Sequence, residues 1–193
     1  MKDWKKEILS IPNLLSLFRL ALIPVYILIY LNATNPSDYY LAAAVLAVSC
    51  LTDLIDGKIA RHFNMITTLG KILDPLADKA TQFSLIVCLS IKYPVLLYLI
   101  ALFVIKESFQ LIAGGINLRK GIMLKGALLT GKICTTILFI SLILLVMIPT
   151  LSYSAVTIIT IVDMVFMAIA FADYLMAYFK KESKFQKINE QNK

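Results

Sequence analysis

Residues 39–91 read YYLAAAVLAVSCLTDLIDGKIARHFNMITTLGKILDPLADKATQFSLIVCLSI. Two apolar runs, Tyr39–Ile55 and Ile72–Ile91, flank a short polar connection. Each run approaches the roughly 20 residues that a helix needs to cross the hydrocarbon core of a bilayer. Charged residues crowd where the runs meet, namely Asp53, Asp56, Lys58, Arg61, Lys71, Asp74, Asp78 and Lys79. The stretch therefore predicts two membrane-spanning helices whose charged ends lie together at one edge of the membrane.

Four further apolar runs lie outside this stretch: Leu14–Leu31, Tyr93–Ile116, Leu128–Ile148 and Leu151–Phe179. The chain has 193 residues, of which 60% are hydrophobic and 16% charged. A soluble domain is about half apolar and a quarter charged. We therefore expect an all-α integral membrane protein with six transmembrane helices in a single domain, residues 1–193. Residues 1–12 are expected to be an interfacial amphipathic segment instead of a removed signal peptide, and residues 180–193 a polar cytoplasmic tail.

The basic residues predict the orientation of the spans. They gather in the N-terminal segment, in two alternate connections and in the tail, as Lys2, Lys5, Lys6, Lys58, Arg61, Lys71, Arg119, Lys120, Lys125, Lys180, Lys181, Lys184 and Lys187. The other three connections hold only Lys92. By the positive-inside rule, both termini are cytoplasmic and the protein is multi-pass in the cytoplasmic membrane. The net charge of +7 then reflects topology and contact with anionic lipid, and no nucleic-acid partner is expected.

Four aspartates, Asp53, Asp56, Asp74 and Asp78, lie at the facing ends of the two central runs. An ionisable side chain inside a span costs at least about 2.5–3.5 kcal/mol. Helical spacings of three and four place each pair on one face of its helix, and the short connection allows the pairs to converge. Four converging carboxylates repel one another unless cations neutralise them, and hard oxygen ligands suit Mg²⁺, Mn²⁺ or Ca²⁺. The alternative is that these aspartates are ordinary helix-end residues exposed to water at the interface. The presence of four such residues in register makes this alternative less favourable.

The residues between the two pairs suit a phosphate. Arg61 offers a planar fork of donors, Gly57 and Gly70 permit close backbone approach, and Ala60 leaves room beside them. A site of this composition at a membrane edge indicates a phosphate-bearing substrate with a lipid tail.

The stretch Asp53-Leu-Ile-Asp56-Gly57-Lys-Ile-Ala60-Arg61, followed after eight residues by Gly70-Lys-Ile-Leu-Asp74-Pro-Leu-Ala-Asp78, resembles the signature of the CDP-alcohol phosphatidyltransferases. Two further segments resemble the bacterial phosphatidylglycerophosphate and cardiolipin synthases of that family. They are Ile11-Pro12-Asn13-Leu-Leu-Ser-Leu-Phe-Arg19 with Pro24, and Gly131-Lys132-Ile133 with Thr135 and Thr136. The likeness covers roughly residues 11–148.

The resemblance implies a six-helix fold, a homodimer and two divalent cations, Mg²⁺ or Mn²⁺. It makes Asp53, Asp56 and Asp74 metal ligands and Asp78 the catalytic base and a possible ligand. Around the cytidine diphosphate moiety it places Gly57, Ala60, Arg61 and Gly70.

The implied reaction transfers a phosphatidyl group from CDP-diacylglycerol to glycerol 3-phosphate, giving phosphatidylglycerol phosphate and CMP. In the fourth span this chain has Ile105-Lys106-Glu107 where such enzymes usually show Ala-Arg-Glu. A lysine binds phosphate as a point charge without the bidentate fork of arginine. A cardiolipin synthase, with phosphatidylglycerol as acceptor, therefore stays open. The candidates for the acceptor phosphate are Lys106, Arg119, Lys125 and Lys132.

A small membrane cation transporter is the alternative from a different class, with Asp53, Asp74, Asp163 and Asp173 along a cation path. The sequence shows no inverted repeat, and the first four acids gather at one edge of the membrane instead of its midplane. Asp163 is instead expected to pair with a polar group on a neighbouring helix, and Asp173 to reach water. Release of CMP from labelled CDP-diacylglycerol would distinguish the enzyme from the transporter.

Overall fold

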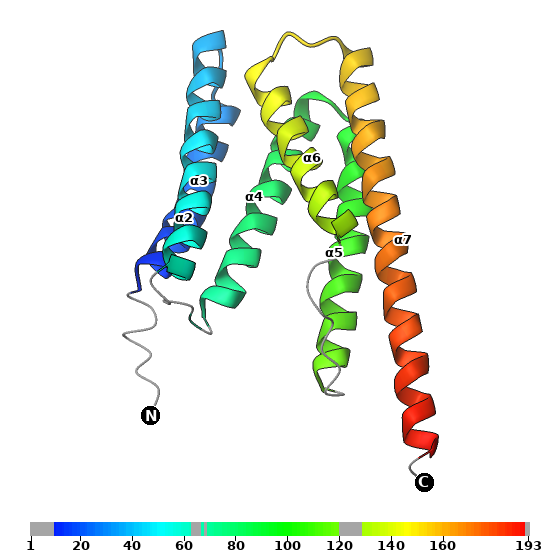
Figure 1. Ribbon diagram of the computed structural model, residues 1–193. Helices are drawn as coiled ribbons and strands as arrows, with labels where there is room; N and C mark the ends of the chain where they lie inside the picture. The colour runs from blue at the N-terminus through cyan, green and yellow to red at the C-terminus, as the bar shows by residue number, and fades with distance from the viewer. Residues whose placement is uncertain (1–9, 63–66, 68, 120–128, 192–193) are drawn as a thin grey trace. The chain divides into compact units, whose positions relative to one another are not determined.

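The computed structural model describes residues 10–62, 67, 69–119 and 129–191, without the side chains of 53–54, 56–62, 71–72, 118–119 and 180–191. Within these residues the chain is all-helical (Figure 1). The helices are α2 (Ile11–Leu31), α3 (Pro36–His62), α4 (Gly70–Lys92), α5 (Leu96–Arg119), α6 (Leu129–Met147) and α7 (Tyr153–Gln191).

Each predicted apolar run falls on one of these six helices, so the all-helical architecture is confirmed. The largest differences lie at the polar ends. Helix α3 continues beyond Ile55 to His62, and α7 continues through the expected polar tail to Gln191. Four helices are long and apolar enough to cross a membrane, namely α2, α5 over Leu96–Asn117, α6 and α7 over Tyr153–Phe179. The chain is therefore a membrane protein.

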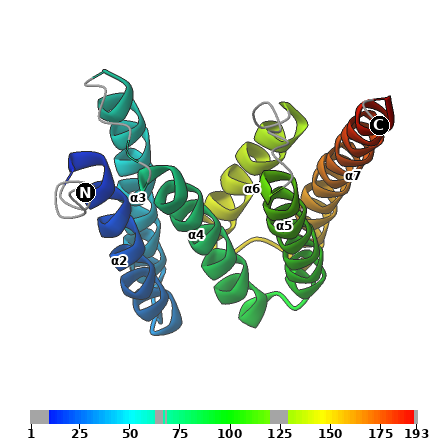
Figure 2. The ribbon, with the colours of Figure 1, turned by 90° about the horizontal axis from the view of Figure 1, so that it is seen from below.

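The chain divides into two compact units. Unit 1 comprises residues 1–94 and 142–151 and contains α2, α3, α4 and the end of α6. Unit 2 comprises residues 95–141 and 152–193 and contains α5, most of α6 and α7. In unit 1, α2 lies beside both α3 and α4 (Figure 2). All four signature aspartates belong to unit 1, so this three-helix packing positions the candidate site.

Helix α2 is apolar on its outside and partly polar on its inside. Its large exposed side chains are Ile11, Leu14, Leu17, Phe18, Val25, Leu28 and Leu31, whereas its buried residues are Pro12, Asn13, Ser16, Arg19, Tyr26 and Tyr30. A soluble helix shows the opposite arrangement, with its apolar stripe turned toward the core. Lipid as the surrounding solvent explains the exposed apolar face, and polar partners inside unit 1 must satisfy the buried one.

The buried face of α2 changes character along its length. Toward its C-terminal end, Tyr26 and Tyr30 are in tilted ring contact at 5.7 Å, and Tyr30 meets Tyr39 of α3 edge to face at 5.6 Å. At the same end of the unit, Lys92 Nζ donates to the Pro149 carbonyl at 2.7 Å and lies 5.3 Å from the centre of the Tyr39 ring. The aromatic half of α2 thus packs at one end of unit 1, and its polar half lies toward the other end.

Helix α3 begins with a defined cap. Pro36 occupies the first turn, and the Asp38 carboxylate accepts the backbone N–H groups of Thr34 and Asn35, both at 2.9 Å. These bonds favour the ionised carboxylate and hold the pKa of Asp38 below its usual value. The cap sets the start of the helix that carries Asp53 and Asp56 at its other end.

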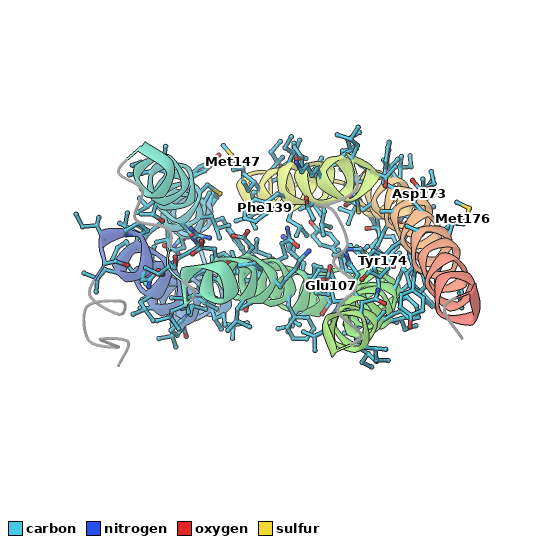
Figure 3. All side chains as sticks on the ribbon, turned by 60° about the horizontal axis from the view of Figure 1, so that its bottom comes forward. Glu107, Phe139, Met147, Asp173, Tyr174 and Met176 are labelled. Carbon is cyan, nitrogen blue, oxygen red and sulfur yellow. The ribbon has the colours of Figure 1, made fainter. Side chains whose placement is uncertain are left out.

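Unit 2 is held by aromatic and polar contacts between its helices. Phe109 of α5 meets Phe171, Tyr174 and Tyr178 of α7 at ring distances of 5.5, 6.1 and 5.9 Å. Tyr174 points toward α5 (Figure 3), where its hydroxyl donates to the Gln110 carbonyl at 3.4 Å. Ser141 of α6 donates to the Asp163 carboxylate at 2.9 Å. The expected pairing of Asp163 with a polar group on a neighbouring helix is confirmed.

Candidate functional site

Asp74 and Asp78 lie one turn apart on α4, close to its N-terminal end. Their spacing of four residues places them on the same face of the helix. Both remain partly accessible, and the Asp78 side chain is 42% exposed. Two adjacent carboxylates at the polar end of a mostly apolar helix need compensating partners, and the described residues supply them from α2.

Ser16 and Arg19 of α2 contact these two carboxylates from the buried side. Ser16 Oγ donates to Asp74 Oδ1 at 2.5 Å, and Arg19 Nη1 donates to Asp78 Oδ1, also at 2.5 Å. Ser16 is fully buried, and Arg19 is only 2% exposed. Hydrogen bonds to an ionised group are shorter and about twice as strong as neutral ones. Helix α2 therefore holds each carboxylate of α4 at one oxygen.

A third contact lies one turn earlier. Asn13 Nδ2 lies 3.0 Å from Thr67 Oγ1, and the same hydroxyl accepts the Gly70 N–H at 2.9 Å. A Cβ atom added to Gly70 would lie 2.6 Å from Asn13 Oδ1. Since Asn13 is 1% exposed and bonded to Thr67, it has little room to give way. Glycine at position 70 thus allows α4 to start directly against α2, in addition to the binding role predicted for it.

The three contacts form a series, which we call the α2–α4 polar seam. Asn13 of α2 meets the start of α4 at Gly70 through Thr67, and Ser16 and Arg19 of α2 meet Asp74 and Asp78 of α4. Steps of three residues on α2 meet steps of four on α4, so the two helices run in the same direction. Both steps keep each set of residues on one helix face. The seam therefore fixes the register between the two helices.

The other half of the predicted signature lies on α3. Asp53, Asp56, Gly57, Ala60 and Arg61 all fall on its C-terminal turns, but their side chains are outside the described residues. Among the side chains that the structure describes, no three metal-binding groups gather. Convergence of the two aspartate pairs accordingly stays a prediction.

Asp74 and Asp78 fit a divalent cation by their chemistry. Each offers hard carboxylate oxygens, and each is partly accessible. Such oxygens suit Mg²⁺ or Mn²⁺ better than soft or imidazole-preferring metals.

The predicted acceptor residues belong to unit 2 or lie outside the described part. Lys106 of α5 is 4% exposed, and its Nζ lies 2.6 Å from Glu107 Oε1. Lys132 is exposed near the start of α6. Arg119 is the last residue of α5, and its side chain lies outside the part that the structure describes. Lys125 lies outside the described residues altogether. Since Lys106 already has a counter-ion, Lys132 is the described candidate whose charge is the most accessible.

Sequence reasoning missed Asn13, Ser16 and Arg19 as parts of the site. The signal was present, because polar residues recur every third position in an otherwise apolar span. Arg19 is also a charge inside a span, which by itself indicates a functional position with a partner. The resemblance drew on the same segment but attached no role to these residues.

Comparison with known proteins gives an independent result for most of the chain. A family model described as CDP-alcohol phosphatidyltransferase matches residues 9–175, which extends beyond the expected 11–148. A CDP-diacylglycerol–glycerol-3-phosphate 3-phosphatidyltransferase of Aquifex aeolicus is 34% identical over 178 residues, or 89% of this chain and 97% of the relative. The enzyme of the same name from Rickettsia bellii is 45% identical over 71 residues, or 36% of this chain and 38% of the relative.

A cardiolipin synthase (CMP-forming) of Streptomyces coelicolor is 37% identical over 117 residues, or 60% of this chain. The matched part spans about half of that relative, 54% of its length. The family model, in contrast, runs through both structural units and includes the whole polar seam. This chain belongs to the CDP-alcohol phosphatidyltransferase family.

Proposed function

We propose that the protein transfers a phosphatidyl group from CDP-diacylglycerol to glycerol 3-phosphate and releases CMP. The observation that carries the proposal is the match with the Aquifex aeolicus enzyme of that name over nearly the full length of both chains. The intact signature and the accessible carboxylates of Asp74 and Asp78 support the same reaction. Since the family model runs through both structural units, we treat residues 1–193 as one functional domain.

The proposed topology has six spans with both termini in the cytoplasm. In this topology α3 and α4 also cross the membrane, in addition to the four apolar helices. The charged ends of α3 and α4 would lie at the cytoplasmic face of the cell membrane. The distribution of lysine and arginine supports this orientation. A site at that edge suits a substrate whose cytidine is soluble in water and whose acyl chains are soluble in lipid.

Asp53, Asp56, Asp74 and Asp78 would hold two divalent cations, Mg²⁺ or Mn²⁺. The family generally uses a divalent metal, and the two described carboxylates fit one. Bound cations supply charge neutralisation for the pyrophosphate and for departing CMP. Gly57, Ala60, Arg61 and Gly70 would surround the cytidine diphosphate, where the Arg61 fork suits a phosphate.

Asp78 would take the proton from the acceptor hydroxyl. Its carboxylate is partly exposed while Arg19 holds one oxygen, so an acceptor can approach it without displacing α2. A general base must first lie within reach of the proton that it takes, and the ion pair with Arg19 fixes where the Asp78 carboxylate lies.

A cardiolipin synthase remains the second candidate because of the Streptomyces coelicolor relative and because of Lys106. The pairing of Lys106 with Glu107 leaves it little net charge for an incoming phosphate dianion.

The homodimer implied by the family resemblance stays a prediction, which cross-linking of the protein in native membranes would test.

The acceptor can be identified directly with purified protein, labelled CDP-diacylglycerol and a panel of four acceptors. We expect CMP release with glycerol 3-phosphate, and little with serine, inositol phosphate or phosphatidylglycerol. Strong release with phosphatidylglycerol alone would establish the cardiolipin reaction instead. No release with any acceptor would contradict the transferase proposal.

Removal of the cation should abolish turnover. We expect EDTA to stop CMP release by the wild-type protein and added Mg²⁺ or Mn²⁺ to restore it, because the carboxylates need cations to receive a pyrophosphate. Asp74→Ala should lower kcat by at least about a hundredfold, with little rescue by excess Mg²⁺. An EDTA-insensitive transferase would show that the cation assignment is wrong.

The acceptor phosphate should depend on Lys132. Lys132→Ala should raise the KM for glycerol 3-phosphate about tenfold, as expected for one lost charge-assisted hydrogen bond. The KM for CDP-diacylglycerol should change little, because other residues hold that substrate. Equal effects on both KM values would indicate general damage, and no effect on either would remove Lys132 from the acceptor site.

The topology can be tested with single cysteines in a background without Cys50, Cys88 and Cys134. A cysteine at Asn35, before α3, should react with an impermeant thiol reagent from outside the cell. One at Asn64, which lies outside the described residues, should react only from the cytoplasmic side. Labelling of both from one side would contradict the six-span arrangement.

A further inference from the structure

We propose that Ser16 and Arg19 of α2 are positioning residues of the transfer reaction, which fix the carboxylates of Asp74 and Asp78 from the buried side. This inference rests on the proposed function. It assigns a role in turnover to a helix that lies outside the aspartate signature.

Burial shows how Ser16 and Arg19 can act. Ser16 is fully buried and Arg19 is 2% exposed, so neither side chain presents a surface to a soluble acceptor. Asp78, which Arg19 contacts, is 42% exposed. The outer member of this pair can meet a substrate and the inner member cannot. The printed contacts give them a route to the reaction through the carboxylates of Asp74 and Asp78.

The contacts restrict the motion that matters for chemistry. An aspartate on a helix can rotate about two side-chain bonds, and an oxygen held at 2.5 Å by a second helix removes most of that freedom. Displacement of a reacting group by about 1 Å can cost on the order of a hundredfold in rate. The seam thus links the register of two helices to the position of two reactive side chains.

The residue types also suit this role. Asp74 and Asp78 are adjacent like charges, and Arg19 lowers their repulsion while it orients Asp78. Ser16 Oγ also lies 3.1 Å from the Pro12 carbonyl, but the shorter contact and the negative charge favour Asp74 as its acceptor. An apolar side chain at position 16 or 19 could fill the same space, but it could not orient the carboxylate of Asp74 or Asp78.

The ion pair complicates the obvious catalytic variant. Asp78→Asn removes the proposed base and also the negative charge that the buried guanidinium of Arg19 contacts. A loss of turnover in that variant would combine both effects. Substitutions on α2 separate them, because they leave all four signature aspartates in place.

The test compares Ser16→Ala and Ser16→Thr in the purified full-length protein, with whichever acceptor the wild-type protein uses. Ser84→Ala is the matched control, because the Ser84 hydroxyl on α4 donates to the carbonyl of Ala80 in its own helix at 2.8 Å. We measure kcat, the KM for CDP-diacylglycerol and the Tm in EDTA. The Tm reports structural damage without metal or substrate.

Ser16→Ala should lower kcat about tenfold with the KM for CDP-diacylglycerol within about twofold of wild type, because the hydrogen bond that positions Asp74 is lost while the signature aspartates stay in place. Ser16→Thr keeps the hydroxyl and should recover kcat to within about threefold of wild type. Ser84→Ala should retain both constants. Wild-type kcat in Ser16→Ala, or a loss that Thr does not rescue and that follows the Tm, would overturn the role of Ser16.

Arg19 is tested with Arg19→Lys, which keeps a positive charge for the buried pair and loses the planar fork. Its Tm should stay near wild type while kcat falls about tenfold at a nearly constant KM for CDP-diacylglycerol. Wild-type kcat in this variant, or a fall that matches a lost Tm, would overturn the role of Arg19. A wild-type protein that releases no CMP with any acceptor would overturn the proposed function, and this inference with it.

Discussion

An arginine buried in an apolar span needs a negative partner, and Arg19 has one in Asp78 at 2.5 Å. Insertion of an arginine at the centre of a span costs about 2.5–3.5 kcal/mol even on lenient scales, so α2 is stable in lipid only if its polar face is satisfied inside the protein. The α2–α4 polar seam provides that satisfaction. Because its partners occur at fixed steps on both helices, only one register pairs them all.

This constraint links folding to the candidate chemistry. The residues that keep α2 and α4 together are the same ones that leave Asp74 and Asp78 accessible at the polar end of α4. Tyrosines and Lys92 close the far end of the unit, and the contacts to Asp74 and Asp78 lie at the other end. A phosphate-bearing lipid suits such an end, because its charged group meets polar side chains while its acyl chains stay in the bilayer.

Much of this could be predicted from the sequence. Run lengths of about 20 apolar residues gave the helices α2 to α7, because a bilayer imposes a length that soluble proteins do not. The aspartate signature could be found for a related reason, since several charges beside apolar runs are costly and therefore indicate a functional site. The family match over residues 9–175 agrees with both.

The contacts between helices could not be predicted in the same way. The spacing of Asn13, Ser16 and Arg19 indicates one polar face but does not say which helix it meets, and α2 packs on both α3 and α4. Similarly, the sequence predicts Lys106 as a phosphate ligand, whereas in the structure its Nζ lies 2.6 Å from Glu107 Oε1. Pairing of this kind depends on side-chain direction and tertiary packing, which a linear pattern of residue types does not contain.

The most direct test of the account is a double-mutant cycle on Arg19 and Asp78, read from the unfolding stability of the protein in EDTA. Arg19→Met and Asp78→Asn should each destabilise the protein, because each removes one side of the ion pair between α2 and α4. The double variant should be more stable than the sum of the two losses predicts, with a coupling of about 1–3 kcal/mol. Additive losses would show that the two side chains do not interact in the folded protein, and would contradict the polar seam as the interaction that sets the site.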